Sequence, residues 1–337
     1  MVSPTTSHDV AKKAGVSIAT VSRVLNNSPL VTEAVRRKVL RAVKALNYQP
    51  NRAAQRLRAG RSHVLGLIIS DIQNPFFTSV VRGIEDVAHR HGYSLVLCNS
   101  DEDPEKEKLY IDVMRSEKVA GVILASALQA NPQVDDLITH NIPVVAIDRQ
   151  IDGRQIDSVL AKNIDGARAA VSHLIELGHR CIGFIGLPLT RTPGKERCEG
   201  YQLALRDHKL PVSKKLVRIA DAKQQGGYES TRDLLAQEAC VTALFVANNL
   251  MTLGALDAIR ERSLKIPDDI SIIGFDDMPW ANLLQPPLTA IAQPTYELGQ
   301  RAAELLLGRL KDRTKPVVHE HLETRLIVRG STSAPRS

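Results

Sequence analysis

Pairs of polar residues directly follow apolar, strand-like runs at four places in the chain. These pairs are Ser70-Asp71, Asp148-Arg149, Asn248-Asn249 and Asp276-Asp277. Carboxylates accept hydrogen bonds from hydroxyl groups, whereas guanidinium groups and amides donate them, so the set suits a ligand with many hydroxyls. Arg197 and Gln293 stand in comparable settings, and Phe76 and Phe77 could pack on the face of a sugar ring. Any single pair could simply be a strand end that faces solvent. This explanation is weaker for four pairs than for one.

A second group of candidate residues lies in the strongly basic N-terminal part of the chain. Residues 1–62 contain 12 Lys and Arg but two acidic residues, Asp9 and Glu33, which gives a charge of +10; residues 63–337 carry −3. This asymmetry indicates a module that binds a polyanion, joined to a nearly neutral body. A solubilising tail is the alternative, and the regular apolar periodicity of the segment argues against it.

Within this basic part, the stretch AGVSIATVSRVLNN predicts a short helix with an outward face that could contact DNA. Arg23 can form a paired hydrogen bond to guanine, and Ile18 and Ala19 can touch a thymine methyl group. Helix pairs with a glycine turn also occur without a nucleic-acid role, so the charge decides for DNA. The candidate contacts to bases and phosphates are Ser17, Ile18, Ala19, Thr20, Ser22, Arg23 and Asn26.

Residues 51–61, NRAAQRLRAGR, are basic and helix-prone, yet too short for a helix that is stable alone. They could form a plain linker. Alternatively, they fold only on DNA and insert Leu57 between base steps of the minor groove. The candidate DNA contacts in this segment are Asn51, Arg52, Ala54 and Leu57.

Three helices are expected to position the DNA-contacting face. Thr6 with Asp9 resembles a capping box for the first, Gly15 ends it, and Ser17 and Thr32 can cap the second and third. One apolar stripe runs along each helix and would bury it against the others. Two short helices around a glycine turn, covered by a third, are typical of a helix-turn-helix.

From residue 63 onward, apolar runs of strand length alternate with amphipathic helical stretches. The runs are VLGLIIS, SLVLCNS, GVILAS, VVAID, CIGFIG, ALFVANN and SIIGFDD. Buried β-branched runs of this kind predict parallel sheets in a doubly wound α/β architecture, where ligands bind at the carboxyl ends of the strands. About 270 residues exceed one sheet's usual size, so two lobes are expected.

These residues carry a resemblance to a known family. The segment from His8 to Gly60 is similar to the DNA-binding headpiece and hinge helix of the lactose-repressor family of bacterial transcription regulators. The body resembles the effector domains of those repressors and periplasmic sugar-binding proteins. The resemblance implies an all-α helix-turn-helix headpiece (1–50), a hinge helix (51–62) and a two-lobed α/β domain (63–337). The lobes would be 63–161 with 294–322, and 162–293 with 323–337.

The resemblance also implies roles for individual residues. Ile18, Ala19 and Arg23 match base-contacting positions, and Leu57 matches the minor-groove wedge. The implied effector contacts are Phe76, Phe77, Asp148, Arg149, Arg197, Asn248, Asp276 and Gln293. Asn249 stands where the family usually has Asp. Ala222 stands where many members place an aromatic ring, which leaves the pocket roomier.

The four cysteines form no CxxC pair, so the sequence predicts neither a disulfide nor a zinc site. No metal or cofactor is expected. The N-terminal segment has no apolar core of a signal peptide, and no 18-residue apolar window follows. The chain is therefore expected to be a soluble, cytoplasmic protein associated with the nucleoid, without membrane contact.

Taken together, the sequence predicts a DNA-binding transcription regulator, a repressor that binds a pseudopalindromic operator as a homodimer and responds to a sugar or sugar acid. A dimer is expected because the final residues show no leucine heptads. A ligand carrier and a sugar kinase or hydrolase are the alternatives. The headpiece opposes the first, and the second lacks a P-loop, a GxSxG elbow and an HExxH motif.

Overall fold

The computed structural model describes residues 5–25, 28–48 and 62–336. They fall into two compact units that divide between Ser62 and His63. The sequence-predicted DNA contacts Asn26, Asn51, Arg52, Ala54 and Leu57 lie outside the described residues.

The described part of the N-terminal unit contains three helices around a small apolar core. They are α1 (Ser7–Ala14), α2 (Ile18–Leu25) and α3 (Glu33–Ala45). Val10, Val21 and Val39, one from each helix, are fully buried. The stripe predicted for each helix therefore packs the three helices together.

The ends of these helices follow the predicted capping chemistry with one exception. Thr6 and Asp9 form the capping box of α1, and Gly15 ends the helix at φ 66°. The Ser17 hydroxyl accepts from the Thr20 backbone N–H at 3.1 Å. Thr32 occupies the cap position of α3, but its side chain makes no cap hydrogen bond, so the expected role of that side chain was wrong.

The C-terminal unit is built from two six-stranded sheets, which define two lobes. In lobe one the order is β2 (Ser94–Asn99), β1 (Val64–Ile69), β3 (Gly121–Leu124), β4 (Val144–Ile147), β5 (Asp157–Ala161) and β11 (His319–Leu322), all parallel. In lobe two it is β7 (Val217–Ile219), β6 (Ile182–Gly186), β8 (Ala243–Val246), β9 (Ser271–Phe275), β10 (Thr289–Ala292) and β12 (Arg325–Ile327). Strand β12 runs antiparallel to β10, and the other pairs of lobe two are parallel.

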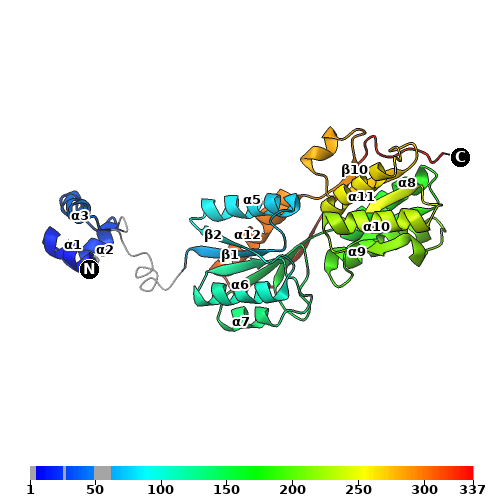
Figure 1. Ribbon diagram of the computed structural model, residues 1–337. Coiled ribbons are helices and arrows are strands. Elements are labelled where there is room, and N and C mark those ends of the chain that lie inside the picture. Colours follow the sequence, from blue (N-terminus) through cyan, green and yellow to red (C-terminus); the bar gives the residue numbers. More distant parts are fainter. Residues whose placement is uncertain (1–4, 26–27, 49–61, 337) are drawn as a thin grey trace. The chain divides into compact units, whose positions relative to one another are not determined.

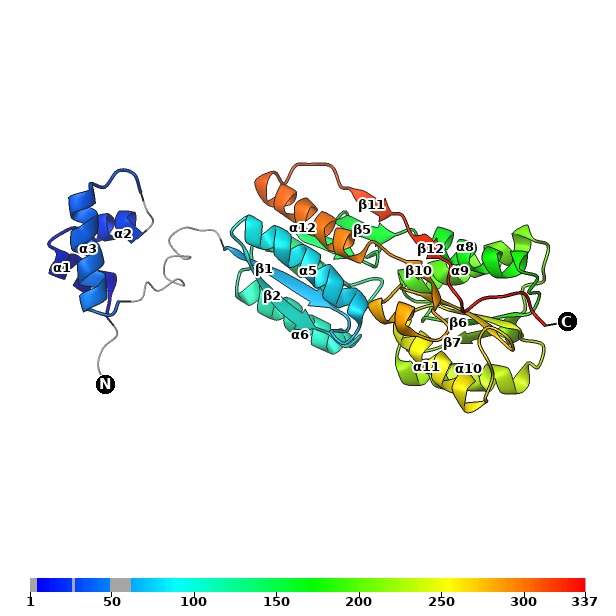
Figure 2. The same ribbon diagram turned by 90° about the horizontal axis from the view of Figure 1, so that it is seen from above.

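Helices cover both faces of each sheet, as a doubly wound fold requires. Figure 1 shows α5 and α12 on one face of the lobe-one sheet and α6 and α7 on the other, and Figure 2 shows α8 and α9 opposite α10 and α11 in lobe two. The lobe-one helices are α5 (Pro75–Arg90), α6 (Pro104–Ser116), α7 (Gln133–Thr139) and α12 (Thr295–Lys311). The lobe-two helices are α8 (Asn163–Glu176), α9 (Thr192–Asp207), α10 (Gln224–Gln237), α11 (Asn249–Glu261) and the short 3-10 turns η1 (Lys214–Leu216) and η2 (Pro279–Leu283).

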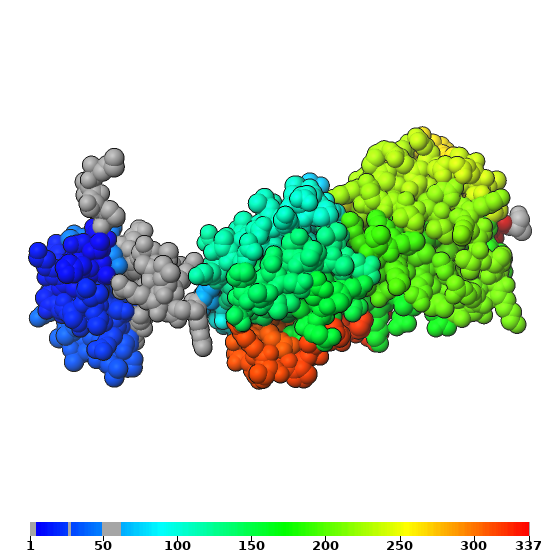
Figure 3. All heavy atoms as spheres, turned by 90° about the horizontal axis from the view of Figure 1, so that it is seen from below, coloured from blue at the N-terminus to red at the C-terminus, as the bar shows by residue number. Residues whose placement is uncertain are grey.

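The chain passes between the lobes at three crossovers. They lie between β5 and α8, between β10 and α12, and between β11 and β12. In Figure 3 the orange segment that includes the end of α12 lies against lobe one, although it follows all of lobe two's helices in sequence. Each lobe is therefore assembled from distant parts of the sequence.

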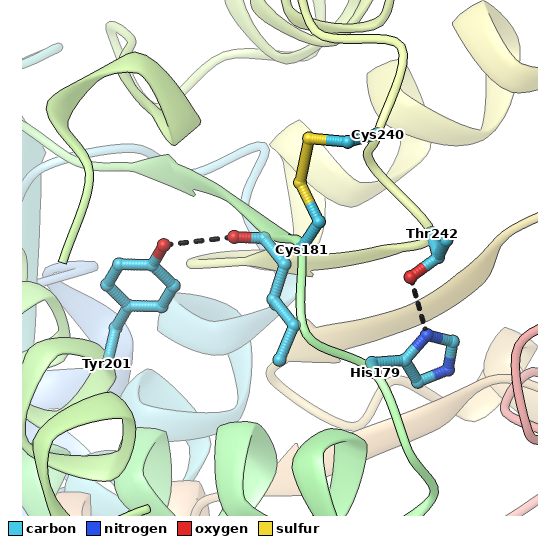
Figure 4. The surroundings of a disulfide bond; sticks show 6 residues. His179, Cys181, Tyr201, Cys240 and Thr242 are labelled. Atoms are coloured by element: carbon cyan, nitrogen blue, oxygen red, sulfur yellow. Dashed lines mark hydrogen bonds between the residues drawn. A yellow bond between two sulfur atoms is a disulfide. The ribbon is translucent and has the colours of Figure 1, made fainter. Parts of the chain in front are cut away.

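Cys181 and Cys240 are joined by a disulfide, so the expectation of no disulfide was wrong. Cys181 immediately precedes β6, and Cys240 lies in the turn that leads to β8 (Figure 4). Because Ile182 pairs with Ala243 in the sheet, the two Cα atoms lie 5.9 Å apart despite a separation of 59 residues. Cys98 and Cys198 are free thiols.

Among the residues that the structure describes, no helix is both long and apolar enough to cross a membrane.

Helices α10 and α11 of lobe two pack closely together, and replacing a glycine at their contact tests this packing. A Cβ atom added at Gly254 would lie 1.9 Å from the Gln224 carbonyl oxygen, whereas one at Gly308 of α12 would meet only the Lys315 ammonium, at 3.6 Å. We expect Gly254→Ala to lower the free energy of unfolding by about 1–3 kcal/mol because the helices must separate. Gly308→Ala should raise it by up to about 1 kcal/mol through helix propensity. Urea unfolding measures both, and equal effects would contradict the packing argument.

Candidate functional site

A cavity lies between the lobes where the strands of both sheets end. Each of the eight sequence-predicted effector contacts lines it. The cavity has a volume of about 50 Å³, enough for a few ordered water molecules. The lining residues are Asp71, Asn74, Phe76, Phe77, Glu102, Asp148, Arg149, Leu187, Arg191, Pro193, Gly194, Arg197, Ala222, Lys223, Asn248, Asp276 and Gln293.

Two carboxylates enter the cavity from corresponding strand ends of the two lobes. Asp148 follows β4 and Asp276 follows β9, and both have positive φ, 66° and 77°. Such backbone geometry is costly for a residue other than glycine and is concentrated at functional sites. Burial raises the pKa of both carboxyls. The next residue, Asp277, points elsewhere and pairs with Arg329 at 2.7 Å.

Arg197 of α9 is the buried cation of lobe two. Its Nε donates to Asn163 Oδ1 at 2.8 Å and a terminal nitrogen donates to the Ala247 carbonyl at 2.7 Å. The guanidinium carbon lies 3.7 Å from the centre of the Phe275 ring, a cation–π contact. Burial lowers the pKa of Arg197, and the opposing pull of the Asp276 and Asp148 carboxylates does not fully offset it. The group stays charged, because arginine does not deprotonate in proteins.

Arg149 and Glu102 form a paired ion bridge inside lobe one. Both terminal nitrogens of Arg149 donate to Glu102, at 2.5 and 2.7 Å, and one also donates to the Ser126 carbonyl at 3.0 Å. Burial alone would lower the pKa of Arg149, but the bonds to Glu102 outweigh it and the net shift is upward. The bridge fixes the guanidinium group at the cavity wall.

The remaining predicted contacts complete the wall. Asn248 begins α11, and its side chain accepts from the Met251 N–H at 2.8 Å and donates to the Ala222 carbonyl at 3.0 Å. Gln293, in the second crossover, donates to Asp276. Phe76 and Phe77 pack edge to face with ring centres 5.0 Å apart. They supply part of the apolar wall of the cavity, together with Leu187, Pro193 and Ala222.

In the part of the chain that the structure describes, four polar contacts join the lobes away from the crossovers. Lys223 pairs with Asp71 at 2.5 Å, and Arg191 pairs with Glu102 at 3.2 Å. The Asn249 amide donates to Asn74 Oδ1 at 2.7 Å, so the residue that departs from the family's usual Asp bridges the lobes. The Gln150 backbone N–H donates to the Thr192 hydroxyl at 3.0 Å.

Sequence reasoning missed several of the lining residues. Asn74 and Arg191 begin helices, Lys223 does the same, and Glu102 lies in a turn. Polar and charged residues of exposed turns look the same in sequence as these four, so no local pattern separates them. Asp71 was recognised as a strand end, but its partner in the other lobe was not.

Asn163 connects the cavity to the first crossover. It accepts from Arg197 and donates to the Ala161 carbonyl at 3.2 Å, at the end of β5, and to Glu196 at 2.9 Å. Its exposure is 1%. It therefore holds the Arg197 guanidinium group and also contacts the first crossover.

We expect Asn163→Ala to weaken effector binding by about 1–2 kcal/mol, because Arg197 and Ala161 each lose a buried partner. Titration calorimetry of the full chain measures this change, and operator titrations with and without effector measure the coupling. Asn282→Ala, at an exposed position of η2, is the control and should change neither. Unchanged effector affinity in Asn163→Ala would exclude the positioning role.

In the N-terminal unit, the predicted DNA-contacting side chains lie on one exposed face of α2. Ser17, Ile18, Ala19, Ser22 and Arg23 are exposed, and Thr20 is half-buried. Val21 and Val24 on the opposite face are buried. Ile18 keeps 39% of its surface open to solvent, which is unusual for a large apolar side chain and suits a contact surface.

Two family models match the chain. "Bacterial regulatory proteins, lacI family" covers residues 6–51, and "Periplasmic binding protein-like domain" covers residues 171–332. The ribose operon repressor of Halalkalibacterium halodurans is 38% identical over 328 residues, which is 97% of each chain. The chain belongs to the lacI family of bacterial regulatory proteins.

Further relatives of this lacI-family chain support the same assignment. The transcriptional repressor PurR of Haemophilus influenzae is 36% identical over 92% of each chain. A lac repressor dimer solved with operator and the anti-inducer ONPF has a TM-score of 0.86 at 32% identity, covering 98% of this chain and 100% of that one. This lacI-family chain is a DNA-binding transcription regulator and not an enzyme, and the two-lobed fold is consistent with effector binding.

Proposed function

We propose that this regulator represses transcription in the bacterial cytoplasm by binding a pseudopalindromic operator as a homodimer. One helix-turn-helix contacts a half-site, so two copies are needed for a palindrome. The exposed face of α2 supports the contact to bases. Residues 51–62 are proposed to form the hinge helix, with Leu57 in the minor groove and Asn51, Arg52 and Ala54 beside it. Light scattering that gives a stable tetramer would contradict the dimer.

We further propose that a sugar or sugar acid in the cavity between the lobes controls operator affinity. The observation that carries this proposal is the convergence of Asp148, Arg149, Arg197 and Asp276 in one cavity that spans both lobes. Hydroxyl groups of a ligand can donate to the carboxylates and accept from the guanidinium groups. The name of the ribose operon repressor is in accord with such a ligand.

The mechanism that we propose is a coupling between two sites. A ligand that contacts both lobes changes the angle between them by motion at the three crossovers. That change alters the spacing of the two hinge segments in a dimer and hence operator affinity. The ligand can act only through its different affinity for the two lobe arrangements, and a coupling of about 1–3 kcal/mol is ordinary.

Gel-shift titrations at fixed salt test the proposal, with sugars, sugar acids, sugar phosphates and purines added in turn. A change in operator affinity with a sugar or sugar acid supports it. If none of these compounds changes the affinity, the effector part of the proposal fails, while the DNA-binding part stands on the operator titration itself.

A further inference from the structure

The charged groups of the cavity are unequally divided between the lobes. Lobe one contributes three carboxylates and one guanidinium group, whereas lobe two contributes three cations and one carboxylate. The lobe-one groups are Asp71, Glu102, Asp148 and Arg149, and the lobe-two groups are Arg191, Arg197, Lys223 and Asp276. The cavity is neutral as a whole, but its two halves carry opposite charge.

Glu102 and Asp71, the carboxylates that pair with the other lobe, also have partners within their own lobe. Glu102 accepts from both terminal nitrogens of Arg149, and Asp71 accepts from the Gln73 backbone N–H at 2.9 Å. Burial raises the pKa of Glu102, yet the bonds to Arg149 and the nearby Arg191 outweigh it and lower the pKa overall. Both carboxylates keep a partner if the lobes separate.

Arg191 and Lys223, in contrast, depend on the opposite lobe. Their ion pairs are with Glu102 and Asp71, and within residues 62–336 neither cation forms an ion pair with a carboxylate of lobe two. Asp221 is close in sequence, but it accepts from the Lys223 backbone N–H and not from the ammonium group. Separation of the lobes leaves both cations without a counter-charge.

The local backbone reinforces this positive site. Arg191 is the cap residue of α9 and Lys223 that of α10, and neither side chain caps its helix. The free N–H groups and the dipole at the start of a helix favour a negative group. The Arg191 side chain is only 18% exposed, so loss of its anionic partner is costly.

We propose that the effector is a polyol that carries an anionic group, a carboxylate or a phosphate, and that Arg191 and Lys223 hold this group. The inference rests on the proposed function of the cavity and narrows its ligand. An anionic group that contacts Arg191 and Lys223 must part their ion pairs with Glu102 and Asp71. An anionic group then replaces Glu102 and Asp71 as partner of the lobe-two cations, which a hydroxyl group does less well.

This exchange of ion-pair partners also explains why the lobes would move relative to each other. The two ion pairs attract the lobes to each other, and an anion bound to Arg191 and Lys223 removes that attraction. Glu102 remains paired with Arg149 after the exchange, so lobe one loses less electrostatic stabilisation than lobe two would without the anion. The anionic ligand therefore has a different affinity for the two lobe arrangements, which is the condition for control.

Titration calorimetry of the full chain tests the inference with two matched sets of probes: ribose, ribonate and ribose 5-phosphate, and glucose, gluconate and glucose 6-phosphate. Inorganic phosphate alone is a further probe. We expect the anionic member of at least one set to bind about tenfold more tightly than its neutral sugar. A preference for ribonate or gluconate identifies a carboxylate, and a preference for the phosphate esters identifies a phosphate.

Substitutions of the two cations test whether they cause the preference for an anionic ligand. Arg191→Gln and Lys223→Gln should each remove most of the preference for the anion. Lys195→Gln is the matched control, since Lys195 lies on α9, is exposed and does not line the cavity, and it should keep the preference. Circular dichroism and operator binding show that each variant is folded.

The inference is overturned if neutral sugars bind as tightly as their anionic partners, if no anionic probe binds, or if the preference survives in both Gln variants. A response of operator affinity to neutral sugars alone would overturn it and leave the proposed function standing. Failure of the proposed function is a separate result, in which no compound changes operator affinity.

Discussion

The Arg197→Ala variant is expected to bind operator DNA with nearly unchanged affinity but to lose its response to effector. Arg197 is 3% exposed, interacts electrostatically with the Asp276 and Asp148 carboxylates, and stacks its guanidinium group on the Phe275 ring. Removing one member of such a buried charge group costs about 2–5 kcal/mol, which is roughly 30- to 4,000-fold in Kd. Calorimetry gives the loss of effector affinity, and gel shifts give the loss of response.

The same substitution also tests whether Arg197 contributes to the stability of the folded protein. It leaves the Asn163 oxygen and the Ala247 carbonyl without their donor, so thermal unfolding will occur at a lower temperature. The conservative variant Arg197→Lys keeps the charge but not the paired geometry, and it should recover stability more than effector affinity. If operator binding collapsed together with the effector response, Arg197 would be structural.

The second large effect is expected for Arg23→Ala in the headpiece. Arg23 is exposed on the last turn of α2, whose opposite face is held by the buried Val21 and Val24. Loss of a paired contact to guanine costs about 1–3 kcal/mol in each half-site. A dimer on a palindrome would therefore lose about 2–6 kcal/mol on its operator, and the variant should tolerate base changes at the contacted position.

The control for this variant is Arg37→Ala on α3, which removes the same charge from another exposed position. We expect Arg37→Ala to weaken binding to operator and random DNA alike, or not at all, because charge alone carries no sequence information. The DNA affinities of both variants are measured by titration at fixed salt on operator and scrambled duplexes. An equal loss on both duplexes for Arg23→Ala would make Arg23 a phosphate contact.

The fold class could be predicted because the central strands of both sheets are buried on both faces. The apolar runs at 64–70, 144–148 and 271–277 gave β1, β4 and β9 in the expected parallel, doubly wound arrangement. The strands that sequence reasoning did not identify are mostly short or at an edge. The lobe-one edge strand β11, HEHL, alternates between exposed and half-buried residues, and β7 has three residues, none of them buried.

Strand ends and the family resemblance predicted different parts of the cavity, and the resemblance implied the roles of Phe76, Phe77 and Arg197, which lie on helices. Asp148 and Asp276 follow apolar runs, so their positions could be inferred from the geometry of parallel sheets. The positions of three other lining residues depend on how one lobe faces the other, which no local sequence pattern encodes. These residues are Arg191, Lys223 and Glu102. The Cys181–Cys240 disulfide was missed for a related reason, since neighbouring parallel strands are far apart in sequence.

The three crossovers have a consequence for the order in which the chain folds during synthesis. The ribosome releases α12 and β11 only after all the helices of lobe two, yet α12 packs on α5, and β11 completes the sheet beside β5. A nascent lobe one must therefore wait, with the apolar side of α5 uncovered, while about 130 residues of the other lobe are translated. Chaperone binding to stalled chains should be strongest in this interval.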